Sequence, residues 1–496
     1  MPPEQVRSMD DLLNQLLLSL SLAVNNLESV IEQSSEPRQG RFRFGFKAKK
    51  AAWVWKKEAL DEIISELELW QRRFDPSWYL LIKIASPVID HELAIAKATE
   101  PKTRGPATAA KNPLTLAASV RTILSPSVER TRSLFLPELQ MDWMNIPFSD
   151  AKAGRREGDS KWYVVDSIEF GQAIKVRDIA RDVRVLAAKL SQADPLAFGL
   201  LNCKGLVPIR RQPASPMSPP FGSELTPPSA IPRAHSPSPN QNDYCRFDVI
   251  FRIPQGMEVL QSLRQLLLNS DEQISLSRKI NISREICKAV CFVSTLGFVH
   301  KNIRPESVLC FEDPEATRSH AFLVGFDAFR AADAGTMMGG DMSWARNVYR
   351  HPRRQGMDPS EKYTMKHDIY SLGVCLLEIG LWESFVEYTT DLEFDGPPQP
   401  KFGKSYHDFR KWNQEQGEAG SFSALAFQLK DFLVEQALTR LSPRMGDRYR
   451  SAVISCLTVL DEDNEDFGGL EEEESDEIVA VQFIERIMKT LDTISL

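Results

Sequence analysis

FVHKNIRPESVL, at residues 298–309, is the stretch around which the rest of the chain is organised. It follows a long amphipathic pattern that predicts a helix over residues 274–296, and it leads into a short apolar run. Polar residues lie between these apolar segments, among them His300, Asn302, Arg304 and Ser307. They are the first candidates for a functional loop.

The chain is long and mildly acidic. Its 496 residues predict two or three domains, and a hydrophobic content of 42% is ample to build their cores. A formal net charge of -8 argues against affinity of the whole chain for nucleic acid. The first residues lack the basic segment of a signal peptide, so we expect a cytoplasmic location.

The seven cysteines are scattered, odd in number and without the C-x-x-C spacing of a zinc site. We therefore expect reduced, mostly buried thiols. Cys287 and Cys291 are one helical turn apart, which leaves a metal or redox pair as an alternative, but their apolar neighbours favour core packing.

The stretch 298–309 resembles the catalytic loop of protein kinases, which reads approximately H-R-D-L-K-P-E-N-I-L. The family's Asp, Lys and Asn are replaced by Asn302, Arg304 and Ser307. In the family the Asp accepts the proton of the attacking hydroxyl, and the amide of Asn302 cannot act as a base near pH 7. Ser307 is a poor ligand for magnesium, and Arg304 is a bulkier cation than Lys.

The resemblance also implies a D-F-G magnesium motif after a short strand. The matching residues are Gly325, Phe326 and Asp327, which follow the apolar run 322–324. The carboxylate is therefore missing from its expected position. In an extended chain Asp327 is displaced by about 6 to 7 Å, whereas a magnesium–oxygen bond is about 2.1 Å long.

Two further motifs of the family concern structure rather than catalysis. The A-P-E motif keeps Pro352 but has Arg353 at the position of its Glu, which implies a rebuilt anchor. The run KHDIYSLGVCLLE at 366–378 matches the family's D-x-x-S-x-G-V-x-L-x-E helix. This match implies that Asp368 caps the backbone of the catalytic loop, and it keeps the glycine of the pattern at Gly373.

The part that would bind nucleotide matches the family least. No G-x-G-x-x-G precedes the predicted strands. Lys175, in Ala173-Ile174-Lys175, resembles the Lys of the V-A-I-K strand and is one candidate nucleotide contact, and Arg304 is the other. A second alignment places the third strand at residues 164–170 and leaves no Lys, which makes Lys175 a surface lysine at a helix start.

The first hundred residues contain three helical patterns, at 6–32, 46–74 and 77–98. Residues 38–57 are basic and aromatic, with Arg41, Arg43, Lys47, Lys49, Lys50, Lys56 and Lys57 forming a basic patch. One interpretation is a solvated helix face whose aromatic residues pack inward. The other is contact with an anionic membrane or an acidic partner.

This block resembles the helical prion-inhibition-and-propagation (HeLo-type) domain of fungal signalling and cell-death proteins. The resemblance rests on FKAKKAAWVWKK at 46–57, followed by Leu60, Ile63, Leu67 and Trp70. It covers about the first hundred residues, a shorter block than that family's usual domain. It implies a role in fungal incompatibility or cell-death signalling.

Composition divides the chain into four segments. We expect a helical domain at 1–98, a linker with short ordered pieces at 99–160, a small lobe at 161–256 and a large lobe at 257–496. The small lobe has predicted strands at 162–168, 200–203 and 247–251, a helix at 176–190, and a proline- and serine-rich insert at 212–241 that we expect to be disordered. Its Ser-Pro dipeptides are either phosphorylation sites or ordinary features of such a segment.

The large lobe has helical patterns at 258–268 and 274–296. Near its end we expect an acidic loop at 461–477 and a final helix from 478 to about 491, with Val479, Phe483, Ile487 and Leu491 on its apolar face.

The expected fold class is α+β, with an N-terminal helical bundle followed by a bilobal protein-kinase-like domain. The losses at Asn302, Ser307 and Gly325 favour a pseudokinase that works by binding and switching, without metal or cofactor and with an unidentified protein partner. One alternative is a divergent Ser/Thr kinase that binds ATP without normal magnesium coordination. Another is an effector that acts on membranes through the N-terminal block.

Overall fold

The computed structural model describes part of the chain, and all structural statements below concern that part. It comprises residues 31–32, 47–48, 120–124, 134–137, 141–158, 161–169, 176–210, 244–269, 274–313, 318–331, 342–357, 359, 361–389, 398–417, 420–468 and 476–495. Internal contacts divide the chain into two compact units, essentially Met1–Trp78 and Tyr79–Ile494. Each unit is described by itself.

In the first unit the structure describes two short strands, β1 (Ile31–Glu32) and β2 (Lys47–Ala48), which pair antiparallel. The sequence predicted helix at both places, and at these four residues that prediction is wrong because they pair as strands. The remaining residues of the predicted helices and of the HeLo-like block lie outside the described residues, as do Arg41, Arg43, Lys49, Lys50, Lys56 and Lys57.

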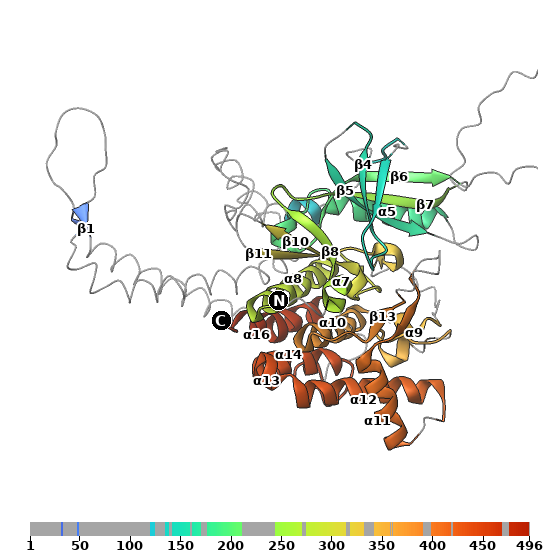
Figure 1. Cartoon of the computed structure of the whole chain (residues 1–496). Coiled ribbons are helices and arrows are strands. Elements are labelled where there is room, and N and C mark those ends of the chain that lie inside the picture. Colours follow the sequence, from blue (N-terminus) through green and yellow to red (C-terminus); the bar gives the residue numbers. More distant parts are fainter. Residues whose placement is uncertain are drawn as a thin grey trace, which may run out of the picture. The chain divides into compact units, whose positions relative to one another are not determined.

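The second unit is a mixture of α and β structure. It contains a five-stranded antiparallel sheet of order β3-β4-β5-β7-β6 (Figure 1), which a short helical segment at residues 120–124 precedes in the chain. The strands are β3 (Met141–Asn145), β4 (Lys152–Arg156), β5 (Trp162–Glu169), β6 (Asn202–Arg210) and β7 (Tyr244–Arg252). Helix α5 (Val176–Leu190) follows β5, and the short helix α6 (Pro195–Phe198) leads into β6. The sequence predicted the helix at 176–190 with these bounds.

The sheet starts earlier in the chain than the sequence indicated. β3 and β4 precede residue 161 and pair with each other and with β5, so the structure places them in the sheet and not in a linker. Leu134–Leu136 also joins, through hydrogen bonds between its backbone and that of Leu206. The residues of β3 are mostly exposed and lack an alternating apolar pattern, so backbone pairing and not burial makes this strand.

A three-stranded sheet of order β11-β10-β8 connects the first sheet to the helices. Its strands are β8 (Glu258–Ser262), β10 (Val308–Asp313) and β11 (Arg318–Leu323). The helix predicted over 258–268 is therefore wrong in its first half, where the chain pairs with β10. Helix α7 (Leu263–Leu268) begins only after Ser262, whose hydroxyl caps it by accepting the N–H of Gln265.

The rest of the unit is mainly helical. Figure 1 shows α8 (Leu276–Thr295), α10 (Met365–Leu381) and α14 (Asp447–Leu457) grouped together. Around them lie α9 (Trp344–Asn347), α11 (Lys404–Gln416), α12 (Phe422–Arg440) and α13 (Ser442–Met445). The short strand pairs β9 (Phe298–Val299) with β12 (Arg330–Ala331), and β13 (Val386–Tyr388) with β14 (Pro400–Phe402), complete it.

The C-terminal helical segment packs on this group. It runs through α15 (Asp476–Gln482), a π-helical turn (Phe483–Met488) and α16 (Lys489–Asp492). The four residues of its predicted apolar face, Val479, Phe483, Ile487 and Leu491, are all buried, which confirms that prediction. Part of the predicted acidic loop, residues 469–475, lies outside the described residues, as does the insert 212–241.

All seven cysteines are free thiols, and all but Cys245 are buried. Burial raises the pKa of the Cys291 thiol to about 12, so it behaves as a neutral core residue. Of the helices that the structure describes, none combines the length and the apolar character needed to cross a bilayer.

Candidate functional site

The loop at 300–307 lies between β9 and β10, and a side chain of α10 binds its backbone. The Asp368 carboxylate, in the first turn of α10, accepts the backbone N–H of His300 at 2.7 Å and that of Lys301 at 2.9 Å. The hydroxyl of Tyr363 donates to the same carboxylate at 2.8 Å. These are the contacts expected of a residue that caps the loop. Burial raises the pKa of Asp368 to about 6, against the effect of the two N–H donors.

Asn302 binds the displaced acid of the degenerate magnesium motif. Its Nδ2 donates to Asp327 Oδ1 at 2.7 Å and to the carbonyl of Gly325 at 3.2 Å. Arg346 Nη1 lies 3.7 Å from the other oxygen of Asp327. In an extended chain Asp327 would lie away from the metal position because of its displacement along the sequence. The structure brings its carboxylate into the same loop, where an amide and a guanidinium contact it.

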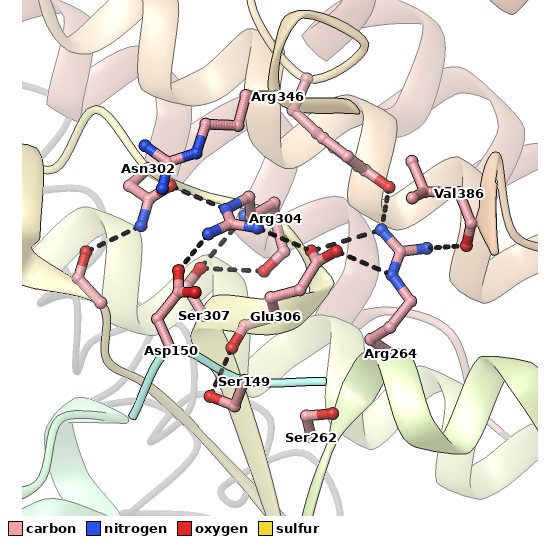
Figure 2. Close-up of polar contacts among 12 residues, drawn as sticks. Ser149, Asp150, Ser262, Arg264, Asn302, Arg304, Glu306, Ser307, Arg346 and Val386 are labelled. Carbon is pink, nitrogen blue, oxygen red and sulfur yellow. Dashed lines mark hydrogen bonds and ion pairs between the residues drawn. The ribbon is translucent and has the colours of Figure 1, made fainter. Parts of the chain in front are cut away.

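Arg304 is buried and is contacted by protein groups (Figure 2). Its Nε donates to Asn302 Oδ1 at 2.8 Å, its Nη2 pairs with Asp150, and its Nη1 lies 3.5 Å from Glu306 Oε2. Ser307 closes the loop on itself, because its hydroxyl donates to the carbonyl of Arg304 and accepts the N–H of the same residue. The degenerate positions therefore form one hydrogen-bonded network.

Asp166 is a site residue that sequence reasoning missed. It lies on β5, is almost fully buried, and its Oδ2 accepts the backbone N–H of Gly325 at 2.9 Å and that of Phe326 at 2.7 Å. Burial is the main cause that raises the pKa of Asp166 to about 7; the nearby carboxylates of Asp327 and Asp150 act in the same direction, and the N–H groups of Phe326 and Gly325 act against it. The signal that could have identified it was a carboxyl group that follows the apolar residues 162–165 inside a predicted strand.

The pKa of Asp166 predicts a pH-dependent stability. An unfolded Asp titrates near 3.8, so between about pH 4 and pH 7 the native state holds a proton that the unfolded state has lost. The contribution of Asp166 to stability is therefore lost as the pH rises through this window. Compared with the variant Asp166→Asn, the wild type should lose on the order of a few kcal/mol of unfolding free energy between about pH 4.5 and 7.5.

Urea unfolding of both proteins at several pH values measures this difference. The variant Asp142→Asn is the control, because Asp142 forms an exposed ion pair with Arg155 in the same sheet and should show little such change. A difference between wild type and Asp166→Asn that stays constant with pH would contradict the buried, proton-holding state of Asp166.

Gly325 leaves no room for the missing carboxylate. Its φ is 82°, and a Cβ added there would lie 2.8 Å from the Cβ of Ser307 and 3.2 Å from Asn302 Nδ2. Among the described residues, no group of three or more His, Cys, Asp or Glu side chains could hold a metal ion. The residues present therefore do not fit the magnesium of a kinase site.

A second feature that sequence reasoning missed is the buried Arg264, in the first turn of α7 (Figure 2). Its Nε is 3.1 Å from Glu306 Oε1 and its Nη1 is 3.1 Å from Glu378 Oε1 of α10. It also contacts the carbonyl of Val386 and the hydroxyl of Tyr349. Burial alone would raise the pKa of Glu306, but the positive charges of Arg264 and Arg304 lower it to about 2. Burial raises the pKa of Glu378.

The remaining predicted positions are structural or undescribed. Pro352 starts a buried 3-10 turn, and Arg353 in that turn pairs with Glu361 at the surface. Gly373 allows α10 to approach α14 closely, since a Cβ there would lie 2.8 Å from the Cβ of Cys456. Lys175, the candidate nucleotide contact, lies outside the described residues.

A cavity of about 740 Å³ lies beside the sheet. The residues that line it come from the sheet, from the segment after β7, and from β8 and β10: Met144, Ala153, Lys161, Trp162, Tyr163, Arg252, Ile253, Gln255, Met257, Leu260 and Phe311. None of these lining residues belongs to the loop at 300–307. The cavity and the loop network are therefore built from different side chains.

Comparison with known proteins links part of this chain to kinases. No family model matches the chain. Over 124 residues it is 32% identical to a serine/threonine-protein kinase-like protein of Arabidopsis thaliana. The match covers 24% of this chain and spans about a third (33%) of that protein. Part of the chain is therefore kinase-like in sequence.

Proposed function

We propose that the chain from Met141 to the C-terminal helical segment is a bilobal kinase-like domain that does not transfer phosphate and acts by binding a protein partner and switching its conformation. The fold is supported by a five-stranded sheet with helix α5, followed by a mainly helical part. Asp368 capping the loop at 300–307 and the similarity to a kinase-like protein support the same assignment.

The main support for the proposed lack of phosphate transfer is the position of Asp166 on β5. In protein kinases the third strand of the small lobe bears the Lys that binds the nucleotide phosphates. β5 is the third strand of this sheet in chain order, and the side chain that it directs at the Gly325–Phe326 backbone is an acid. An acid at this place, protonated or ionised, cannot supply the positive charge with which the Lys binds phosphate groups.

The loop network supports the same conclusion. Asn302 cannot accept a proton from a hydroxyl group, and its amide is already bonded to Asp327. Arg304 is engaged by Asp150 and Asn302. Catalysis of phosphoryl transfer depends on preorganised charges around the phosphates, and the described residues direct these charges at one another.

ATP binding and phosphate incorporation together test the proposal. Because any ligand that binds only the native state raises the melting temperature, ATP with Mg²⁺ should produce no greater rise than ATP alone. Radiolabelled phosphate should not be incorporated above the level of a heat-treated control. A magnesium-dependent rise, with incorporation that Arg304→Ala abolishes, would establish the divergent kinase instead.

A further inference from the structure

The connection between β3 and β4, residues 146–151, folds onto the loop at 300–307, and we call it the β3–β4 turn. Its Ser149 hydroxyl donates to the carbonyl of Glu306 at 2.8 Å, and the Asp150 carboxylate pairs with the guanidinium of Arg304 (Figure 2). These partners lie far away in the sequence. The turn thus fills the space in front of the loop with its own side chains.

The same turn is held from a second side. The ring of Phe148 lies 4.9 Å from the ring of Tyr388 on β13, measured between centroids, and the hydroxyl of Ser262 donates to the carbonyl of Pro147 at 2.6 Å. Tyr388 in turn donates its hydroxyl to Glu306 Oε1 at 2.7 Å. The turn therefore lies between β13 and the loop and contacts both.

Backbone geometry indicates that these contacts hold the turn in an unfavourable state. Phe148 has a φ of 53°, in the left-handed region that a bulky side chain rarely adopts. Such a conformation persists only when surrounding contacts impose it. Release of the turn would relieve this strain. The side chain of Asp150 is also about half exposed (53%), so water can compete for its ion pair.

The groups that the turn contacts would remain ordered without it. Arg304 keeps its hydrogen bond to Asn302 and its proximity to Glu306, so loss of Asp150 leaves no unpaired buried cation. Tyr388 keeps its bond to Glu306, and Ser262 keeps its role as the cap of α7. The ring of Tyr388, the carbonyl of Glu306 and the guanidinium of Arg304 thus form one set of contact groups for the turn.

We propose that these three groups form a recognition site for a protein segment of aromatic–hydroxyl–acidic sequence, which Phe148-Ser149-Asp150 occupies in cis. The aromatic side chain stacks on Tyr388, the hydroxyl donates to the Glu306 carbonyl, and the carboxylate pairs with Arg304. A partner segment with this chemistry competes with the turn. Because the cis segment is present at a high effective concentration, an isolated partner binds weakly until the turn is loosened. The site does not depend on whether the domain transfers phosphate.

The test uses the full chain and a labelled peptide with the sequence of residues 145–152, Asn-Ile-Pro-Phe-Ser-Asp-Ala-Lys. Fluorescence anisotropy measures its binding to the wild type, to Asp150→Asn, which weakens the cis contact, and to the control Asp142→Asn. We expect Asp150→Asn to bind the peptide at least about tenfold more tightly than the wild type and the control do. Peptides in which the Asp is replaced by Asn, or the Phe by Ala, should lose this gain.

Hydrogen exchange measured on the same proteins reports the turn itself. Asp150→Asn should increase amide exchange at 146–151 while leaving α8 and α10 unchanged, which also shows that the variant is folded. Equal peptide affinity for all three proteins would overturn the proposal, and so would equal binding of the Asp and Asn peptides. Unchanged exchange at 146–151 would show that the turn is a fixed part of the sheet, which also overturns it.

Discussion

Replacing Arg264 by alanine is expected to lower the free energy of unfolding by about 3–5 kcal/mol. Arg264 is fully buried between the carboxylates of Glu306 and Glu378, and its removal leaves both in the interior without this cation. Glu306 retains Arg304 as a second cation at 3.5 Å, whereas Glu378 keeps only uncharged partners such as the N–H of Phe385. Most of the loss should therefore arise at Glu378.

Urea denaturation followed by circular dichroism measures this loss. Arg450→Ala is the matched control, because Arg450 forms an ion pair with the exposed Asp447 and should cost less than about 1 kcal/mol. The double variant Arg264→Ala, Glu378→Gln should recover part of the loss, since it removes the stranded charge. Equal losses for Arg264→Ala and Arg450→Ala would show that the buried cluster does not hold the loop to α7 and α10.

Replacing Gly325 by alanine is expected to cost about 2–4 kcal/mol. A φ of 82° places the new side chain in the left-handed region, and its Cβ would lie 2.8 Å from the Cβ of Ser307. The first effect is backbone strain and the second is overpacking inside a buried loop. Both act on the segment whose N–H groups bind Asp166.

Gly158→Ala separates the two effects. Gly158 has a nearly equal φ of 78°, but no atom lies within 4 Å of a Cβ added there. It should therefore show only the strain, about 1–2 kcal/mol. If chemical denaturation gives equal losses for the two variants, the contact with Ser307 is not tight. The aspartate of a magnesium motif has the same Cβ, so Gly325→Asp should destabilise this loop rather than restore a metal site.

Several elements could be predicted from the sequence because local patterns determine them. The helix at 176–190 and the apolar face of the C-terminal helical segment follow from helical periodicity, which burial of one face requires. The contact of Asp368, at the start of α10, with the backbone of the loop was implied by the resemblance of residues 366–378 to the kinase motif. The identities of Asn302, Ser307 and Gly325 showed directly which kinase side chains are absent.

Other features depended on contacts between residues far apart in the chain. β3 has no apolar alternation and exists through its pairing with β4, so no local pattern marked it. Asp166 and Arg264 gain their roles from groups more than forty residues away, and the charge that each meets cannot be read from its neighbours. The same is true of the β3–β4 turn, which was predicted as linker.

In the loop at 300–307, some properties follow from residue identity and others from tertiary contacts. The sequence by itself determined that the amide of Asn302 cannot act as a base near pH 7, because residue identity decides whether a side chain can accept a proton. Only the tertiary structure decided where the remaining charges lie. Asp150 and Asp327 reach the loop from two different segments, and Asp166 binds the backbone of Gly325 and Phe326 beside it. Folding brings these segments together through long-range pairing and burial, which no spacing along the chain records.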